Sequence, residues 1–257
     1  MADFIDRVVV VTGAGRGLGR ATAEAFADLG ASLAICDING EALEEIASVL
    51  ESRGAEVLTC TMDVRDAAQF AMFRDLVHET FGQVDVLVNN AGVMLAGRMR
   101  DMTLEDWRWV VDVNLLGVVH GTHFFYPEMA RRGGGHIVNI ASVGGLAPLP
   151  YFSAYCGVKS AVLAMTRIWR AEGAEHGVGF SAICPSMLNT DVANSFRLRT
   201  GEGLRPVSGP TVRRSEMFLS SRRCNPAGVA QVIVRAVGKN RSVVRVGPGS
   251  RLLDVGE

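Results

Sequence analysis

The octet SAYCGVKS, residues 153–160, places a phenol and an ammonium four positions apart. If this segment is helical, Tyr155 and Lys159 lie one turn apart on the same face. A phenol can give up a proton, and a neighbouring cation stabilises the phenolate that remains, so the pair is suited to proton transfer. The same spacing fits a core tyrosine beside a lysine that extends its ammonium to water. On the octet alone, this second interpretation is the simpler one.

A glycine-rich stretch near the start of the chain could bind phosphate. The apolar run RVVVV, residues 7–11, leads directly into TGAGRGLGRA, so that Gly13, Gly17 and Gly19 open a predicted helix. Glycines allow a tight turn and let a pyrophosphate approach the N–H groups at a helix start. Asp37 ends the next apolar run, eighteen positions after Gly19, where a carboxylate can bind ribose hydroxyls. We expect a dinucleotide site that also includes Arg16 and Leu18 of the turn.

Asp37 and Arg16 favour different dinucleotides. The Asp37 carboxylate would repel the 2′-phosphate of NADP and accept hydrogen bonds from the free hydroxyls of NAD. The guanidinium of Arg16 could pair with that phosphate instead. We weigh Asp37 more heavily, so the expected cofactor is NAD, with NADP less favoured.

The elements that position these residues follow from an alternation of two patterns. Short β-branched apolar runs alternate with longer segments of helical period, which is typical of a parallel sheet covered by helices on both faces. No linker divides the chain, so residues 1–257 are expected to form one doubly wound α/β domain. The predicted strands are 7–11, 31–37, 55–60, 84–90, 135–142, 178–185 and 242–247, and the predicted helices are 17–29, 41–52, 66–81, 103–130, 153–176 and 226–239.

The segment 186–225 interrupts the alternation and is predicted to be an irregular lid over the site, on the carboxyl side of the sheet. Between Arg197 and Cys224 it holds seven arginines and two glutamates, which form either a solvated surface or a site attractive to an anionic or phosphopantetheine-linked substrate. The expected pocket walls are apolar and comprise residues 93–96, 144–152 and Met187 with Leu188. They favour a hydrophobic alcohol or ketone.

Several motifs together resemble those of the short-chain dehydrogenase/reductase family. They are the T-G-x-x-x-G-x-G turn from Thr12, NNAG at 89–92, Asn114, Ser142, and Tyr155-x-x-x-Lys159, in that order. The similarity extends from Thr12 to the last predicted strand. It implies a single Rossmann-type domain with a seven-stranded parallel sheet and helices on both faces.

The resemblance also implies roles for individual residues. Asn114, Ser142, Tyr155 and Lys159 would form a catalytic tetrad, in which Ser142 holds the substrate oxygen and Asn114 binds a water that links Lys159 to solvent. The cofactor would further contact Asp63 and Val64 at the adenine, Asn90, Ala91 and Gly92 along its length, and Thr190 at the nicotinamide carboxamide. Two positions depart from the family pattern: Ser186 follows Pro185 where glycine is usual, and Gly157 takes a helical position more often filled by alanine.

The function expected from these residues is an NAD-dependent interconversion of a secondary alcohol and a ketone. Tyr155 would exchange the hydroxyl proton, with its pKa brought down toward neutrality by Lys159 and by the positive nicotinamide ring. An NADPH-dependent 3-ketoacyl or carbonyl reductase is the alternative that Arg16 and the basic segment would suit. A dinucleotide-binding protein without turnover is the alternative outside the enzymes, and the complete tetrad argues against it.

Composition excludes several other classes. The formal net charge of -1 gives no electrostatic argument for nucleic acid or anionic membrane as a partner, and no apolar run reaches the length of a membrane span. Five cysteines without C-x-x-C spacing favour a reduced, cytoplasmic location over a disulfide framework. The five histidines are scattered without a ligand spacing, so no metal is expected. The resemblance implies that the helices at 103–130 and 153–176 pack between subunits of a homo-oligomer, a tetramer or a dimer.

Overall fold

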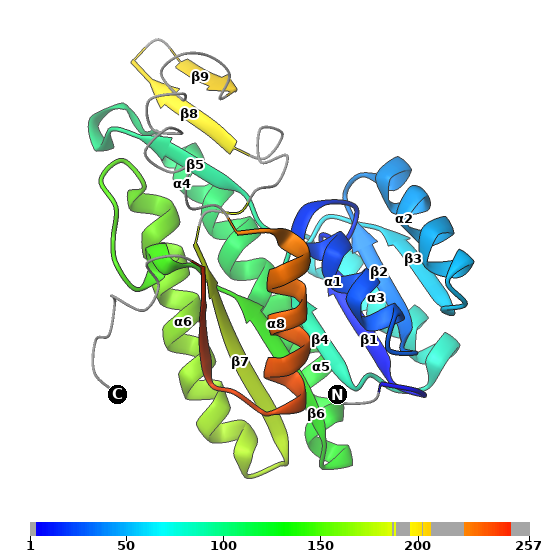
Figure 1. The fold of residues 1–257 in the computed structure, drawn as a ribbon. Helices are drawn as coiled ribbons and strands as arrows, with labels where there is room; N and C mark the ends of the chain where they lie inside the picture. The colour runs from blue at the N-terminus through cyan, green and yellow to red at the C-terminus, as the bar shows by residue number, and fades with distance from the viewer. Residues whose placement is uncertain (1–3, 187, 189–195, 202, 207–223, 248–257) are drawn as a thin grey trace.

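The computed structural model describes residues 4–186, 188, 196–201, 203–206 and 224–247, which form a seven-stranded parallel sheet with helices on both faces (Figure 1). The strand order is β10-β7-β6-β4-β1-β2-β3. Its strands are β1 (Val8–Thr12), β2 (Ser32–Asp37), β3 (Val57–Thr61), β4 (Val86–Asn89), β6 (Gly135–Ile140), β7 (Val178–Pro185) and β10 (Val243–Val246). All seven predicted strands and the doubly wound Rossmann-type fold are thereby confirmed.

The helices divide between the two faces of the sheet. They are α1 (Gly17–Ala27), α2 (Gly40–Ser52), α3 (Ala67–Phe81), α4 (Leu104–Val111), α5 (Gly117–Arg132), α6 (Ser153–Ala174) and α8 (Pro226–Gly238). Val9 and Val11 of β1 belong to a core shared with α1, α2 and α8, whereas Val8 and Val10 belong to one shared with α3 and α5. Because successive side chains of a strand point to opposite faces, a strand buried on both sides is apolar on both, as residues 8–11 of β1 are.

The predicted helix at 103–130 is interrupted. A π-helical segment, Asp112–Leu116, separates α4 from α5 and contains Asn114, whose side chain is fully buried. A π turn adds one residue to a helical turn, and such insertions occur frequently at functional sites. Helical periodicity continues across the insertion, so the sequence pattern did not reveal it.

A second, three-stranded sheet corrects the prediction of an irregular segment at 186–225 over its described residues 196–201 and 203–206. Strand β5 (Met94–Gly97) pairs in parallel with β8 (Phe196–Thr200), and β8 pairs antiparallel with β9 (Gly203–Pro206). This sheet lies beyond the carboxyl ends of the main strands, at the top of Figure 1. The sequence FRLRT of β8 alternates apolar and charged residues, which is a strand pattern that the high arginine content obscured.

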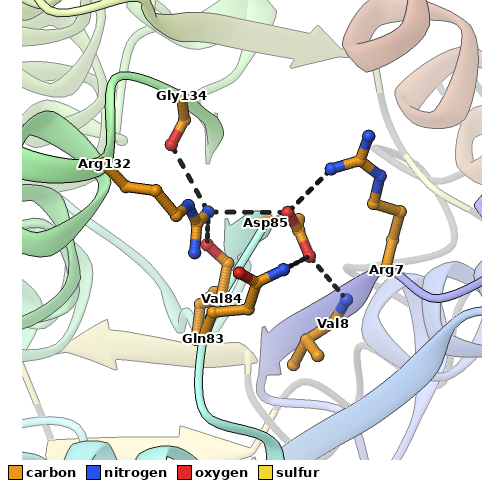
Figure 2. A network of polar contacts seen from close by, with 7 residues as sticks. All are labelled: Arg7, Val8, Gln83, Val84, Asp85, Arg132 and Gly134. Atoms are coloured by element: carbon orange, nitrogen blue, oxygen red, sulfur yellow. Dashed lines mark hydrogen bonds and ion pairs between the residues drawn. The ribbon is translucent and has the colours of Figure 1, made fainter.

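At the amino ends of the main strands, one carboxylate contacts two arginines (Figure 2). Asp85, just before β4, accepts hydrogen bonds from Arg7 at 3.0 Å and from the backbone N–H of Val8 at 3.0 Å. Arg132, at the end of α5, contacts the same carboxylate at 3.5 Å and donates to the carbonyl of Val84 at 2.6 Å. This network joins the amino ends of β1 and β4 to α5. It lies at the opposite ends of the strands from the glycine turn, which follows the carboxyl end of β1.

No helix among the described residues combines the length and apolarity needed to cross a bilayer. Within those same ranges, no three histidine, cysteine, aspartate or glutamate side chains come together in a metal-binding group.

Candidate active site

The glycine turn between β1 and α1 has a shape that only glycine permits. Gly13 and Gly17 adopt positive φ angles of 65° and 59°. A Cβ atom at Gly19 would overlap the carbonyl oxygen of Gly13 and approach Asn90 Nδ2 to 2.5 Å. The first turn of α1 carries no acidic residue, so its N–H groups and the positive helix end remain available to an anion. This turn can hold a pyrophosphate.

Two other predicted residues of the turn differ in orientation. Arg16 occupies the N-cap position of α1 with an exposed side chain that makes no capping hydrogen bond. The side chain of Leu18 is buried in the core between the sheet and α1. Leu18 can therefore contribute only its backbone to a cofactor.

Hydrogen bonds connect Asn90 and Ala91, which follow β4, to the glycine turn. The Thr12 hydroxyl accepts hydrogen bonds from the backbone N–H groups of Asn90 and Ala91, both at 3.0 Å. Asn90 Nδ2 donates in return to the carbonyls of Thr12 at 2.9 Å and Gly13 at 3.0 Å. Thr12 was not among the predicted site residues, although its place at the head of the T-G-x-x-x-G-x-G motif was a signal for it.

The Asp37 carboxylate faces the same turn. Its Oδ2 accepts from Gly15 N–H at 2.9 Å, and its Oδ1 accepts from Asn39 N–H at 3.0 Å. A carboxylate has about four acceptor positions, so both oxygens can accept further bonds from ribose hydroxyls. Gly15 is a second contact residue that the sequence analysis did not single out.

The residues predicted at the adenine are already engaged within the protein. Arg65 donates to Asp63 Oδ2 at 2.6 and 2.8 Å, and this hydrogen bonding lowers the pKa of the Asp63 carboxyl. Val64 is buried, and its carbonyl oxygen lies 2.9 Å from His120 Nδ1. An adenine that contacts the Asp63 carboxylate would therefore share it with Arg65.

Lys159 is buried next to the segment that follows β4. Its ammonium donates to the carbonyl of Ile140 at 2.7 Å and lies 5.9 Å from the centre of the Tyr155 ring. A Cβ atom on Gly92 would lie 2.7 Å from Asn114 Oδ1 and 3.8 Å from Lys159 Nζ. Gly92, Asn114 and Lys159 therefore lie close together, with no room for a side chain at residue 92.

The predicted lowering of the Tyr155 pKa is wrong for the protein without a bound dinucleotide. Burial raises the pKa of the phenol, and the hydrogen bond with Ser142 opposes this rise without overcoming it. Lys159 does not offset the burial, because its ammonium is directed to Ile140 and its own pKa is lowered by burial to about 8. Desolvation acts on both members of the pair and disfavours the charged form of each.

Ser142 and Asn114 also make structural contacts. Ser142 Oγ accepts from Gly144 N–H at 3.1 Å, at the start of the 3-10 turn Val143–Gly145. Asn114 Oδ1 accepts from Val93 N–H at 3.0 Å, and its Nδ2 donates to the Val93 carbonyl at 2.9 Å. The amide of Asn114 thus fixes the start of β5, which leaves one amide hydrogen and the main chain for the water expected there.

Part of the predicted pocket and lid can be located. Leu95 and Ala96 were expected to form a pocket wall, but both are buried in the core. Ser186 N–H donates to the Val246 carbonyl at 2.8 Å, so the backbone after β7 stays beside β10 despite the missing glycine. Thr190 and Met187 lie outside the described residues.

Two arginines of the basic segment 197–224 make contacts within the protein. Arg199 forms an ion pair with Asp106, and the Arg197 guanidinium lies 4.1 Å from the centre of the Trp109 ring. These two arginines are therefore not free to attract an anionic substrate. Arg213, Arg214, Arg222 and Arg223 are outside the described ranges.

Comparisons with known proteins agree with this arrangement. Residues 7–200 match the family model described as short chain dehydrogenase. The chain is 38% identical over 95% of its length to "Probable oxidoreductase EphD" of Mycobacterium bovis, although it spans only 42% of that protein. It is 36% identical to meso-2,3-butanediol dehydrogenase of Serratia marcescens, over 75% of this chain and 76% of that one.

A solved structure provides a third comparison. A short-chain dehydrogenase/reductase from Burkholderia phymatum, crystallised in complex with NAD, superposes with a TM-score of 0.85 at 34% identity, covering 95% of this chain and 90% of that chain. The chain belongs to the short-chain dehydrogenase/reductase family.

Proposed function

We propose that the protein is an NAD-dependent oxidoreductase that interconverts a secondary alcohol and a ketone, with Tyr155 as the acid and base. The observation that carries the proposal is the position of the Lys159 ammonium, which is buried, donates to the Ile140 carbonyl and lies beside Gly92 and Asn114. A buried cation costs free energy unless polar or charged groups compensate it. Tyr155 is the ionisable neighbour one helical turn away.

The residues of the candidate site fit a dinucleotide. Its pyrophosphate would rest on the turn formed by Gly13, Arg16, Gly17, Leu18 and Gly19, in the space that a Cβ at Gly19 would distort. The adenosine would lie toward Asp37, Asp63 and Val64. The nicotinamide end would lie toward Asn90, Ala91, Gly92, Tyr155, Lys159 and Thr190.

In the proposed oxidation, the alcohol loses one hydrogen as a hydride and one as a proton. The bound NAD would supply the acceptor for the hydride that leaves the carbinol carbon. The ionised Tyr155 takes the hydroxyl proton, and Ser142 holds the substrate oxygen by a hydrogen bond as it becomes a carbonyl oxygen. With the dinucleotide bound, the field of Lys159, added to that of the positive nicotinamide ring, would stabilise the ionised phenol. In the reverse direction Tyr155 returns the proton to the alcohol oxygen.

The preference for NAD rests on Asp37. Its two oxygens accept from Gly15 and Asn39 and face the turn with their remaining lone pairs, where a 2′-phosphate would meet a like charge. The Burkholderia relative with bound NAD supports this assignment by similarity. If the wild type turned over faster with NADP than with NAD at equal low concentration, the assignment to NAD would be wrong.

The substrate class is inferred from the exposed apolar residues near Tyr155. Leu149 and Tyr151, in the loop before α6, expose 47% and 61% of their surface. They favour a hydrophobic alcohol or ketone, and the butanediol dehydrogenase relative supports a secondary alcohol. An NADPH-dependent 3-ketoacyl or carbonyl reductase is less favoured, because Arg197 and Arg199 are engaged within the protein.

The same proposal covers assembly and location. Leu104 on α4 and Ile168 on α6 expose 75% and 57% of their surface, which suits a homo-oligomer, tetrameric or dimeric, built on these helices. The five cysteines are free thiols, as expected for a cytoplasmic protein of one domain. Light scattering of the purified chain measures the assembly, and a monomer would contradict it.

The test is a screen of alcohols and ketones with NAD(H) and NADP(H), followed by the absorbance of the reduced nicotinamide. We expect reduced NAD to form with at least one hydrophobic secondary alcohol. Binding of NAD without turnover of any alcohol or ketone would instead support a dinucleotide-binding protein that lacks catalysis.

A further inference from the structure

The structure contains a partly buried ion pair outside the tetrad, between Arg199 and Asp106. Arg199, on β8, donates through Nε to Asp106 Oδ2 at 2.7 Å and through a terminal nitrogen to Asp106 Oδ1 at 2.6 Å. The Asp106 side chain is 6% exposed and that of Arg199 is 18% exposed. Two parallel bonds between a guanidinium and a carboxylate fix orientation as well as distance. This pair is therefore rigid compared with a surface ion pair.

Asp106 also belongs to the capping box at the start of helix α4, in which Thr103 is the N-cap. Its carboxylate accepts from Thr103 N–H at 2.9 Å, and its own N–H donates to the Thr103 hydroxyl at 3.2 Å. Burial alone would raise the pKa of Asp106, but the hydrogen bonds from Arg199 and Thr103 hold it below its ordinary value. The carboxylate thus stays charged while it joins β8 to the first turn of α4.

A second arginine of β8 contacts the same helix. Arg197 lies two residues before Arg199 and therefore on the same face of the strand. Its guanidinium stacks over Trp109, three residues after Asp106 along α4. Strand β8 is therefore held against α4 at two successive points.

These contacts continue toward Tyr155. Arg199 pairs in register with Gly97 of β5, and a Cβ on Gly97 would lie only 2.9 Å from Arg199 Cβ. Gly97 N–H donates to the carbonyl of Tyr151 at 2.8 Å, four residues before Tyr155. Buried Leu95, Val110, Ala154 and Val158 join β5, α4 and the first turns of α6 in one cluster. The position of β8 is thereby coupled to the start of the helix that carries Tyr155 and Lys159.

We propose that Arg199 is a positioning residue for the substrate: its ion pair with Asp106 fixes β8 against α4 and β5, which is hydrogen-bonded to the loop before Tyr155, and so sets the affinity for the alcohol or ketone. The inference rests on the proposed function, which supplies the substrate. The pyrophosphate and adenosine would bind at the turn after β1 and the end of β2, away from the nicotinamide end, so we expect the pair to act on substrate affinity more than on dinucleotide affinity.

The experiment compares steady-state kinetics of four variants. In Arg199→Met we expect the substrate KM to rise about tenfold or more, with the KM for NAD within about twofold and kcat within about threefold of wild type. Arg199→Lys restores the charge without the two-pronged geometry, so its substrate KM should lie between those of the wild type and Arg199→Met. Asp106→Asn keeps an acceptor for Thr103, and the double variant Asp106→Asn/Arg199→Met should be no worse than Arg199→Met alone.

Arg74→Met is the matched control. Arg74 contacts Asp75 at equally short distances, 2.6 and 2.7 Å, through two nitrogens on the single oxygen Oδ1, on the surface of α3. Its loss should leave all three kinetic constants unchanged. Equal changes in the KM for substrate and for NAD in Arg199→Met, or no change in either, would overturn the proposal.

Amide hydrogen exchange tests the positioning without turnover. In Arg199→Met, the amides of Met94–Gly97 and Phe196–Thr200 should exchange at least about tenfold faster, while those of β1 and β2 keep their wild-type rates. This result would stand even if the wild type oxidised no alcohol, so failure of the proposed function is distinguishable from failure of the inference. Unchanged exchange in β5 and β8 would contradict the positioning role.

Discussion

Lys159 donates its ammonium proton to the carbonyl of Ile140 at 2.7 Å and lies 5.9 Å from the centre of the Tyr155 ring. Ile140 ends β6, and Ser142 follows two residues later. The end of one strand therefore holds the lysine by its carbonyl and presents the serine to the phenol. The cation lies beside the phenol and is oriented by the backbone.

Lys159 should make stability depend on pH in a defined window. Burial lowers its pKa from 10.5 to about 8, so between these values the unfolded chain binds the proton and the folded protein does not. The stability of the wild type should rise relative to Lys159→Met by up to about 3 kcal/mol as the pH rises from 8 to 10.5. Below pH 8 the full cost of the buried cation is present and the difference should be constant.

Urea unfolding at several pH values across this window measures the effect. Lys239→Met is the control, because the side chain of Lys239 is exposed at the end of α8. A difference between wild type and Lys159→Met that stayed constant up to pH 10.5 would show that Lys159 is not desolvated.

Asp37→Ala should narrow the preference for NAD over NADP. The substitution removes the carboxylate that would bind the ribose hydroxyls and repel a 2′-phosphate, so the ratio of kcat/KM for the two dinucleotides should fall about tenfold or more. Asp75→Ala, an exposed aspartate on α3, is the control. An unchanged ratio in Asp37→Ala would mean that another residue selects the dinucleotide.

Two glycine substitutions should change different properties: Gly19→Ala should weaken dinucleotide binding, and Gly157→Ala should raise stability. A Cβ at Gly19 would overlap the Gly13 carbonyl, so Gly19→Ala must displace the turn, and dinucleotide binding should weaken by at least about tenfold. A Cβ at Gly157, on the exposed side of α6, meets nothing within 4 Å. Gly157→Ala should therefore stabilise the protein by up to about 1 kcal/mol. Isothermal titration with NAD measures the effect of Gly19→Ala, and thermal unfolding measures that of Gly157→Ala. A destabilised Gly157→Ala variant would contradict the open position of residue 157 on α6.

Asp85→Asn should affect stability without affecting the site. The amide can no longer satisfy Arg7, Val8 and Arg132 together, so the free energy of unfolding should fall by about 1–3 kcal/mol. Because this network lies at the amino edge of the sheet (Figure 2), kcat/KM should remain within about twofold of wild type. A tenfold loss of kcat/KM in a folded variant would contradict this independence and show that the Asp85 network affects the candidate active site.

The extent of sequence-based prediction differed between features. Predominantly apolar runs such as residues 8–11 identified every strand of the main sheet, because strands between two layers of helices carry mainly apolar side chains. Strand β8 was missed, because its arginines are satisfied by Asp106 and Trp109, which are distant in sequence. The π segment at Asn114 was missed because an inserted residue leaves no compositional signal.

The electrostatics of Tyr155 could not be derived from spacing alone. The spacing places Lys159 near the phenol, but the sign of the pKa shift depends on how much water each group loses and on where the ammonium points. Burial and the Ile140 carbonyl, both tertiary features, determine the result.

The most direct test of the central claim is the turnover of Tyr155→Phe with NAD and the best alcohol found for the wild type. This substitution keeps the ring and removes the proton, so kcat should fall at least about a hundredfold while NAD binds with unchanged affinity. Activity within about tenfold of wild type would show that Tyr155 does not carry the proton.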